Sequence, residues 1–221
     1  MWILEFYKKR KIEKLKGRLG KRGCHTFLAY PFNATSPEHV FLGDYAKVLN
    51  HAEIINPIGS FYVGRYAIIS THLTVVTDNH TPTVGIPISF TATLHINEKT
   101  KDVVVGDDCW LGTHVTLLPG AEIGRGSVVG ANTVCNKITP PYAILVGVPA
   151  KIVGVKFTLE QIIMHEKQIY PKEERMTRQE LEQLFATYYE GKKVLGTDFL
   201  SKEDGVRVES YMQSLGFTPY K

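Results

Sequence analysis

The chain is poor in cysteine: its 221 residues include only Cys24, Cys109 and Cys135, and no two of them form a CxxC pair. This pattern predicts neither a disulfide framework nor a cysteine zinc site, and it favours a reducing compartment. No apolar run approaches the ~18 residues of a membrane span. The first apolar residues also precede the basic cluster, which is the reverse of a signal peptide. We therefore expect a cytoplasmic globular protein.

Acidic residues are scarce at the beginning of the chain, where residues 1–22 contain nine basic residues against Glu5 and Glu13. The net charge of this segment is +7, whereas residues 23–221, with 17 basic and 20 acidic residues, carry −3. The whole-chain charge of +4 therefore does not indicate a nucleic-acid-binding protein. We predict a basic amphipathic helix within residues 1–22, whose apolar residues are Trp2, Ile3, Phe6, Ile12, Leu15 and Leu19.

Two interpretations of this helix remain open. In the first, it packs on the rest of the chain and its basic face is solvated. In the second, it contacts an anionic inner-membrane surface.

A six-residue repeat organises the middle of the chain. Five consecutive hexads begin with an aliphatic residue, at Val105, Leu111, Leu117, Ile123 and Val129. The fifth residue of each hexad is small or β-branched, at Cys109, Val115, Ala121, Ser127 and Thr133. Helices and ordinary strands have periods of 3.6 and 2, so this pattern predicts very short strands separated by corners. The aliphatic side chains then stack inward from coil to coil.

The repeat continues upstream and is interrupted once. The same register occurs at Leu42, Val48, Ile54, Val63, Ile69 and Val75, which gives enough hexads for a stacked solenoid. Residues 76–104 break the register and include Pro82, Gly85 and Pro87. Because a long insertion in a compact repeat is usually functional, we expect a structureless loop that carries chemistry.

The stretch GDDCWLGTHVTLLPGAEIGRGSVVGANTV, followed by ITPPYAILVGVPAKIVG, resembles the hexapeptide-repeat acyltransferases. The similar group contains the maltose and galactoside, xenobiotic and sugar O-acetyltransferases. The resemblance implies a mainly β fold, a left-handed parallel β-helix over residues 23–156 with a catalytic loop at 76–104. It also implies acetyl-CoA as acyl donor, direct transfer in a ternary complex, and a homotrimer with active sites between subunits.

Among the eight histidines, His80 stands out because it lies in the register-breaking loop, in TDNHTP. In the resembling enzymes the catalytic histidine occupies such a loop, directly after such a coil. An imidazole near neutral pH suits the removal of one proton from a sugar hydroxyl. The competitor, His72, falls inside a hexad on the coil surface, as do His51 and His114, and Asp78 is a candidate to orient His80 or to bind the acceptor.

The resemblance also implies residues that contact coenzyme A. Thr113 matches the position whose backbone contacts the thiol end, Trp110 is a candidate wall of the pantetheine channel, and Lys151 matches a phosphate-pairing residue. The other implied contacts are Ala131, Asn136, Lys137 and Lys156, the last as a substitute for the basic residue that Gly154 replaces. A backbone N–H at the corner near Thr113 is suited to stabilise the thioester oxyanion.

Residues 157–221 have the composition of a helical extension. Thr158 with Gln161, and Thr177 with Glu180, are capping boxes that open apolar runs, and Gly191 closes the second run. A third helix is expected from near Ser201 to Gly216. We expect these helices to pack on the coils or on a neighbouring subunit.

Several functions remain as alternatives. The prediction is an acetyl-CoA-dependent O-acetyltransferase acting on a sugar hydroxyl of a capsule, O-antigen or other polysaccharide precursor. A xenobiotic O-acetyltransferase and an amino-sugar N-acetyltransferase are the alternatives, and a non-catalytic β-helix is a third. A γ-type carbonic anhydrase is disfavoured because no two histidines are five positions apart, and no metal is expected.

Overall fold

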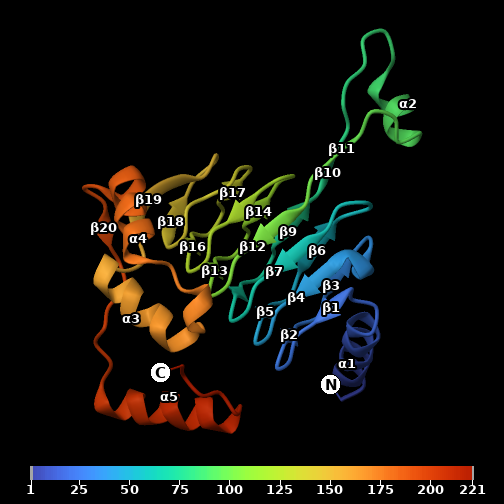
Figure 1. Cartoon of the computed structure of the whole chain (residues 1–221). Helices are drawn as coiled ribbons and strands as arrows, with labels where there is room; N and C mark the ends of the chain where they lie inside the picture. Colours follow the sequence, from blue (N-terminus) through green and yellow to red (C-terminus); the bar gives the residue numbers. More distant parts are fainter. Residues whose placement is uncertain (1, 221) are drawn as a thin grey trace. The chain divides into compact units, whose positions relative to one another are not determined.

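Three parallel β-sheets form the main body (Figure 1), as seen in a computed structural model that describes residues 2–220 and the side chains of residues 5–220. The first sheet contains β1 (Lys21–Arg22), β4 (Val40–Leu42), β7 (Phe61–Val63), β12 (Val103–Val105) and β15 (Glu122–Ile123). The second contains β2 (Phe27–Leu28), β5 (Lys47–Val48), β8 (Ile68–Ile69), β13 (Trp110–Leu111), β16 (Val128–Val129) and β18 (Ala143–Val146). The third contains β3 (Phe32–Ala34), β6 (Ala52–Ile55), β9 (Thr74–Val76), β14 (Thr116–Leu117) and β17 (Val134–Cys135).

From β1 to β17, the strands of the three sheets follow one another in a fixed order, so each of these coils contributes one strand to each sheet. Neighbouring strands within a sheet pair in parallel, as Leu111 does with Ile69 on one side and Val129 on the other. The chain therefore winds as a three-sided parallel β-helix. The predicted coil architecture is confirmed at this level.

The core of the β-helix is the stack of aliphatic residues that the hexads predicted. All eleven are buried: Leu42, Val48, Ile54, Val63, Ile69, Val75, Val105, Leu111, Leu117, Ile123 and Val129. Cys135, which occupies the next position of the same register, is buried as well. The small fifth residues of the five hexads are buried as well. Glycine is required where coils approach: a Cβ added at Gly106 would lie 2.6 Å from the backbone nitrogen of Arg125. The inward stacking predicted from the repeat is therefore confirmed.

The β-helix begins one coil earlier than the repeat indicated. β1, β2 and β3 form a coil over residues 21–34, so the expected division between residues 22 and 23 falls inside it. The reason is that Arg22, exposed in β1, occupies the position that an aliphatic residue fills in later coils. Only Leu28 and Phe32 of this coil are buried apolar residues.

The helix predicted within residues 1–22 is α1 (Trp2–Lys16). Of its predicted apolar residues, Ile12 is buried whereas Phe6 is exposed. Leu15 and Leu19 are half-buried, and the side chains of Trp2 and Ile3 lie outside the described residues.

Residues 77–102 form an arm between β9 and β12, and the arm is not structureless as expected. Its base is a short antiparallel pair, β10 (Asp78–Asn79) with β11 (Lys99–Thr100), and its outer part contains α2 (Ile88–Thr93). Figure 1 shows the arm projecting from the edge of the coils, with α2 near its tip. The register break seen in the sequence therefore marks a folded arm.

The chain divides into two compact units, Met1–Ile152 and Val153–Lys221. The second unit starts four residues before the predicted helical extension, and the extension contains one strand that was not predicted, β20 (Lys193–Val194). β19 (Lys151–Val155), which crosses the division, pairs in parallel with β20 (Lys193–Val194). The helices of this unit are α3 (Leu159–Ile169), α4 (Arg178–Leu184) and α5 (Lys202–Ser214), with a 3₁₀ turn at Lys172–Glu174 and a π turn at Phe185–Tyr189. The first unit has a 3₁₀ turn at Pro37–His39.

The helix starts of the second unit agree with the sequence. Both predicted capping boxes are present, with Thr158 accepting from the Gln161 amide and Thr177 from the Glu180 amide. Ser201 caps α5, the predicted third helix. Within residues 2–220, no helix has the length and apolar character needed to cross a bilayer.

Candidate functional site

Asp78 fixes the base of the arm. Its carboxylate accepts hydrogen bonds from the hydroxyl groups of Thr77 and Thr100, and from the backbone of Gly59 and Ile58. Burial raises the pKa of this carboxyl, but the hydrogen bonds outweigh burial and hold the pKa below its usual range. Asp78 is therefore a charged anchor that ties β10 and β11 to the preceding coil.

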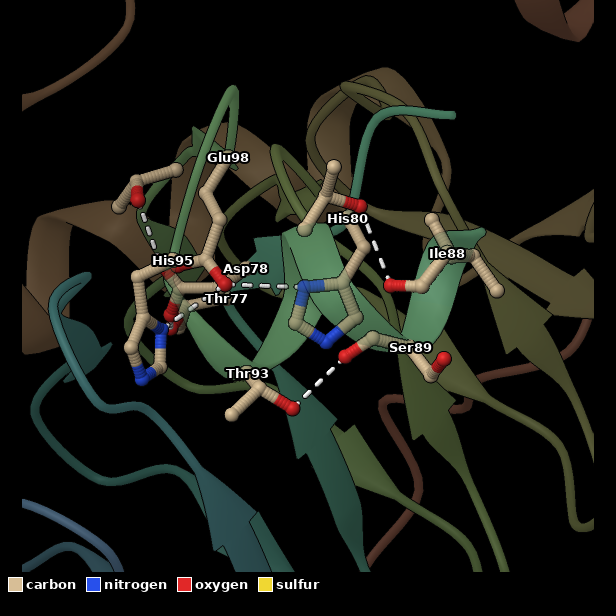
Figure 2. Close-up of polar contacts among 10 residues, drawn as sticks. Thr77, Asp78, His80, Ile88, Ser89, Thr93, His95 and Glu98 are labelled. Atoms are coloured by element: carbon tan, nitrogen blue, oxygen red, sulfur yellow. Dashed lines mark hydrogen bonds and ion pairs between the residues drawn. The ribbon is translucent and has the colours of Figure 1, made fainter. Parts of the chain in front are cut away.

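The imidazole of His80 faces a different carboxylate. His80 Nδ1 lies 2.9 Å from Glu98 Oε1. Figure 2 shows the two side chains pointing toward each other. The side chain of Glu98 is only 6% exposed, whereas that of His80 is 51% exposed. A buried carboxylate on Nδ1 favours the tautomer with a proton on Nδ1, which leaves Nε2 available as a base. The geometry thus assigns to Glu98 the orienting contact for which Asp78 was a candidate.

The pairing at the arm's base brings these two residues together. Asp78 pairs with Thr100 and Asn79 with Lys99, so His80 and Glu98 are the next positions along the same antiparallel pair. Glu98 was missed by sequence reasoning. No sequence pattern marks Glu98, because its place opposite His80 follows only from the register of β10 and β11.

A second histidine shares the same carboxylate oxygen. His95 Nδ1 lies 3.0 Å from Glu98 Oε1, and its side chain is 64% exposed. The other oxygen of Glu98, Oε2, is buried and accepts no hydrogen bond from the residues that the structure describes. His95 is therefore a member of the His80 cluster.

His72, the competitor of His80, lies at a corner of the coils as expected. Its ring stacks between those of His51 and His114, with centroid distances of 4.6 Å and 4.4 Å. Partial burial, followed by the neighbouring rings of His114 and His51, holds the pKa of His72 below its usual value. All three histidines have a positive φ near 60°, and Asn132 takes the same conformation one coil further on. This column of rings is separate from the arm.

Two of the expected coenzyme A contacts lie at consecutive levels of this same corner. Thr113 Oγ1 lies 2.9 Å from Thr71 Oγ1, and the Asn132 amide donates to the Thr113 carbonyl. Ala131 precedes Asn132, and its nitrogen would lie 2.7 Å from a Cβ added at Gly112. The structure thus places Thr113 and Ala131 next to each other at this corner.

The remaining predicted contacts are spread along the chain. Trp110 is exposed on β13, and Asn136 and Lys137 are exposed directly after β17. Lys151 is exposed at the end of the first unit. Lys156 belongs to the second unit, where its Nζ lies 5.3 Å from the centre of the Phe157 ring.

The arm carries an unusual amount of exposed apolar surface. Six large apolar residues between β10 and β11 are exposed: Val84, Ile86, Ile88, Phe90, Leu94 and Ile96. A contiguous exposed apolar segment of this kind indicates an interaction site.

For metal binding, residues 2–220 contain no group of three or more histidine, cysteine, aspartate or glutamate side chains arranged to hold an ion.

Known proteins share sequence and fold with this chain. Residues 102–137, which span β12 to β17, match the family model described as bacterial transferase hexapeptide (six repeats). The chain is 38% identical over 74 residues to a chloramphenicol acetyltransferase of Klebsiella aerogenes, covering 34% of this chain and 35% of that protein. It is 33% identical over 117 residues to an Escherichia coli protein whose name describes a lipopolysaccharide biosynthesis O-acetyl transferase. That alignment covers 52% of this chain and 59% of the relative.

These two alignments span about a third and three fifths of the relatives' own lengths. Among solved structures, a hexapeptide-repeat acetyltransferase of Vibrio cholerae in complex with acetyl coenzyme A aligns with a TM-score of 0.58 and 22% identity. This alignment covers 66% of the present chain and 76% of the other. At that identity the likeness shows a shared fold.

Proposed function

Because the chain carries the bacterial transferase hexapeptide repeat, we propose that it is an acetyl-CoA-dependent O-acetyltransferase that acts on a sugar hydroxyl. The observation that carries this proposal is the contact of His80 with the buried Glu98 on a projecting arm. An oriented, half-exposed imidazole is the group that direct acetyl transfer requires. The likeness to the O-acetyl transferase of E. coli supports a polysaccharide precursor as the acceptor.

In the proposed mechanism, His80 Nε2 accepts the proton of the acceptor hydroxyl while the hydroxyl oxygen attacks the thioester carbonyl carbon. Glu98 stabilises the resulting imidazolium through Nδ1. A backbone N–H at the corner of Thr113 stabilises the oxyanion. When the C–S bond breaks, His80 returns its proton to the departing thiolate, so no acyl-enzyme forms. Cys109 is not required for this route, since it is buried.

For the acyl donor, we assign acetyl-CoA as a substrate held along the corner of the coils. Thr113 and Ala131 supply backbone contacts to the thiol end and pantetheine arm, and Trp110 forms a wall. The phosphates are assigned to Asn136, Lys137, Lys151 and Lys156. The acetyl-CoA complex of the V. cholerae protein with the same fold supports this assignment.

The proposed assembly is a homotrimer of left-handed β-helices with the site between subunits. Its support is the exposed apolar surface of the arm, which a second copy of the chain would cover. His80 would then face the Thr113 corner of a neighbouring copy. This arrangement gives each active site residues from two subunits.

A xenobiotic O-acetyltransferase is the second candidate, and the 38% identity to the chloramphenicol acetyltransferase favours it. An amino-sugar N-acetyltransferase would use the same base on an amine. The two classes of hydroxyl acceptor are separated by a thiol-release assay with acetyl-CoA against sugars, nucleotide sugars, amino sugars and streptogramin or chloramphenicol acceptors. Acetylation of drugs alone would move the assignment to the second candidate.

The role of His80 is tested by His80→Ala, which should lower kcat at least ~10²-fold in that assay. His25→Asn is the matched control, because His25 lies at a different corner with φ 52°, a conformation that asparagine tolerates. The control should keep its activity. Near-normal turnover of His80→Ala would exclude His80 as the base.

A further inference from the structure

The outer face of α1 is basic and aromatic, and much of it is exposed. Ile12 is buried and Leu15 is half-buried, so this side of the helix faces the first coil (Figure 1). On the other sides, Phe6 is 56% exposed and Tyr7 46% exposed. The exposed basic residues of this segment are Lys9, Arg10, Lys11, Lys14 and Arg18.

The two acidic residues of α1 offset these cations only in part, because each is paired with another lysine. Glu5 pairs with Lys8 and Glu13 with Lys16, both at 2.8 Å and both within one turn of the helix. Lys16 also holds the pKa of Glu13 below its usual range, so Glu13 stays ionised as part of that pair. The five exposed cations therefore present a net positive surface around two exposed aromatic rings.

A groove beside this surface adds a place for an anionic group. It has a volume of about 310 Å³ and lies between α1 and the first coil. Lys11, Lys14 and Arg18 line its helix side, while Tyr30, Asn33 and other residues of the first coil line the opposite side. Tyr7 meets Tyr30 edge to face at 6.2 Å, so the exposed aromatic surface continues into the groove.

We propose that the outer face of α1 and this groove bind an anionic phospholipid surface. The cations match the negative charge of the headgroups. The groove is large enough for one phosphate group, which Lys11, Lys14 and Arg18 would contact from the helix side. Phe6 and Tyr7 distinguish a lipid surface from a soluble anion, because exposed aromatic rings between lysines gain by burial at the boundary of headgroups and acyl chains. This proposal does not depend on the proposed acetyl transfer.

The charge contribution can be estimated from the number of cations. Each lysine or arginine near an anionic leaflet strengthens binding by about five-fold. Replacing Arg10 and Lys14 with glutamine should therefore weaken binding to anionic vesicles about 25-fold. Both side chains are exposed, so the substitutions leave the core of the first unit intact.

The test is a sedimentation assay of the full chain with two kinds of vesicle, pure phosphatidylcholine and phosphatidylcholine containing phosphatidylglycerol. We expect binding to the anionic vesicles only, and a loss of this binding at high salt. Lys192→Gln with Lys202→Gln is the matched control, since it removes two exposed positive charges from the second unit. The control should bind as the unchanged chain does.

Three results would overturn the proposal. The first is that the unchanged chain stays in the supernatant with anionic vesicles. The second is that the Arg10→Gln, Lys14→Gln variant binds them as tightly as the control variant. The third is that inorganic phosphate releases the protein more effectively than chloride at equal ionic strength, which would make the groove a site for free phosphate. Circular dichroism of each variant checks that the chain is folded.

Discussion

Replacing Glu98 with glutamine isolates the electrostatic part of the proposed site. Glutamine has nearly the same size as glutamate but carries no charge, so the arm keeps its shape while His80 loses its anionic partner. A hydrogen bond to a charged group contributes about 1.5–3 kcal/mol. Since about 1.4 kcal/mol corresponds to a factor of ten, complete loss of this contact would slow the reaction about 10- to 150-fold.

Solvent reduces this range. Glu98 is 6% exposed, but His80 is 51% exposed, so water screens part of the charge on the imidazolium. We therefore expect kcat of Glu98→Gln to fall about 10- to 50-fold in the thiol-release assay, with the KM for acetyl-CoA changed less than about three-fold. The separation of kcat from KM matters, because a distorted arm would change both.

His95→Asn provides the matched control for this variant. His95 contacts the same oxygen as His80, with its Nδ1 at 3.0 Å from Glu98 Oε1. Asparagine tolerates the φ of 53° at this position. Removing His95 leaves the contact between His80 and Glu98 in place, so kcat should stay within about three-fold. The reasoning is refuted if Glu98→Gln keeps full activity, or if both variants lose activity equally.

Two further predictions concern the coils. The pKa of His72 is lowered in the folded chain, so the unfolded chain takes up a proton first as the pH falls. The free energy of unfolding should therefore decrease below about pH 6.5, and above that pH it should not depend on His72. His72→Asn, which copies Asn132 at the same corner, should remove that part of the pH dependence in chemical denaturation, and an unchanged pH dependence would contradict it. Leu117→Ala should lower the free energy of unfolding by about 2–5 kcal/mol, because Leu117 is fully buried between Val75 and Cys135. Thr116→Ala, on the outer side of the same strand, should lower the free energy of unfolding much less.

The sequence predicted the coils well because their physics is local and periodic. An aliphatic residue recurs every sixth position, and glycine follows it where neighbouring coils come within contact of a Cβ, as at Gly106. The first coil lacked this pattern, since Arg22 replaces the aliphatic residue of β1. Its strands β1, β2 and β3 pair with β4, β5 and β6 of the next coil, which supply finished edges for them. A coil at the end of a stack can therefore depart from the repeat that its neighbours must obey.

The candidate site could be predicted only in part. His80 was found because a break in the repeat is visible in the sequence, and the resemblance pointed to a histidine there. Glu98 was not found, because its contact with His80 depends on an antiparallel register of only two residue pairs. Such a short pair has no alternating pattern to read, and its two strands are 20 residues apart in the chain.

The two carboxylates of the arm differ in role because their surroundings differ. Asp78 receives hydroxyl and backbone hydrogen bonds that fix the arm to the coil, whereas Glu98 has one oxygen on two imidazoles and its other oxygen buried. A two-residue strand pair is not stable by itself, so the anchor at Asp78 is what allows β10 and β11 to hold His80 beside Glu98. Beyond that base, the arm has apolar residues and no core to bury them. The position of the base is therefore set within one chain, while the proposed closure of the site depends on a second copy that covers the tip.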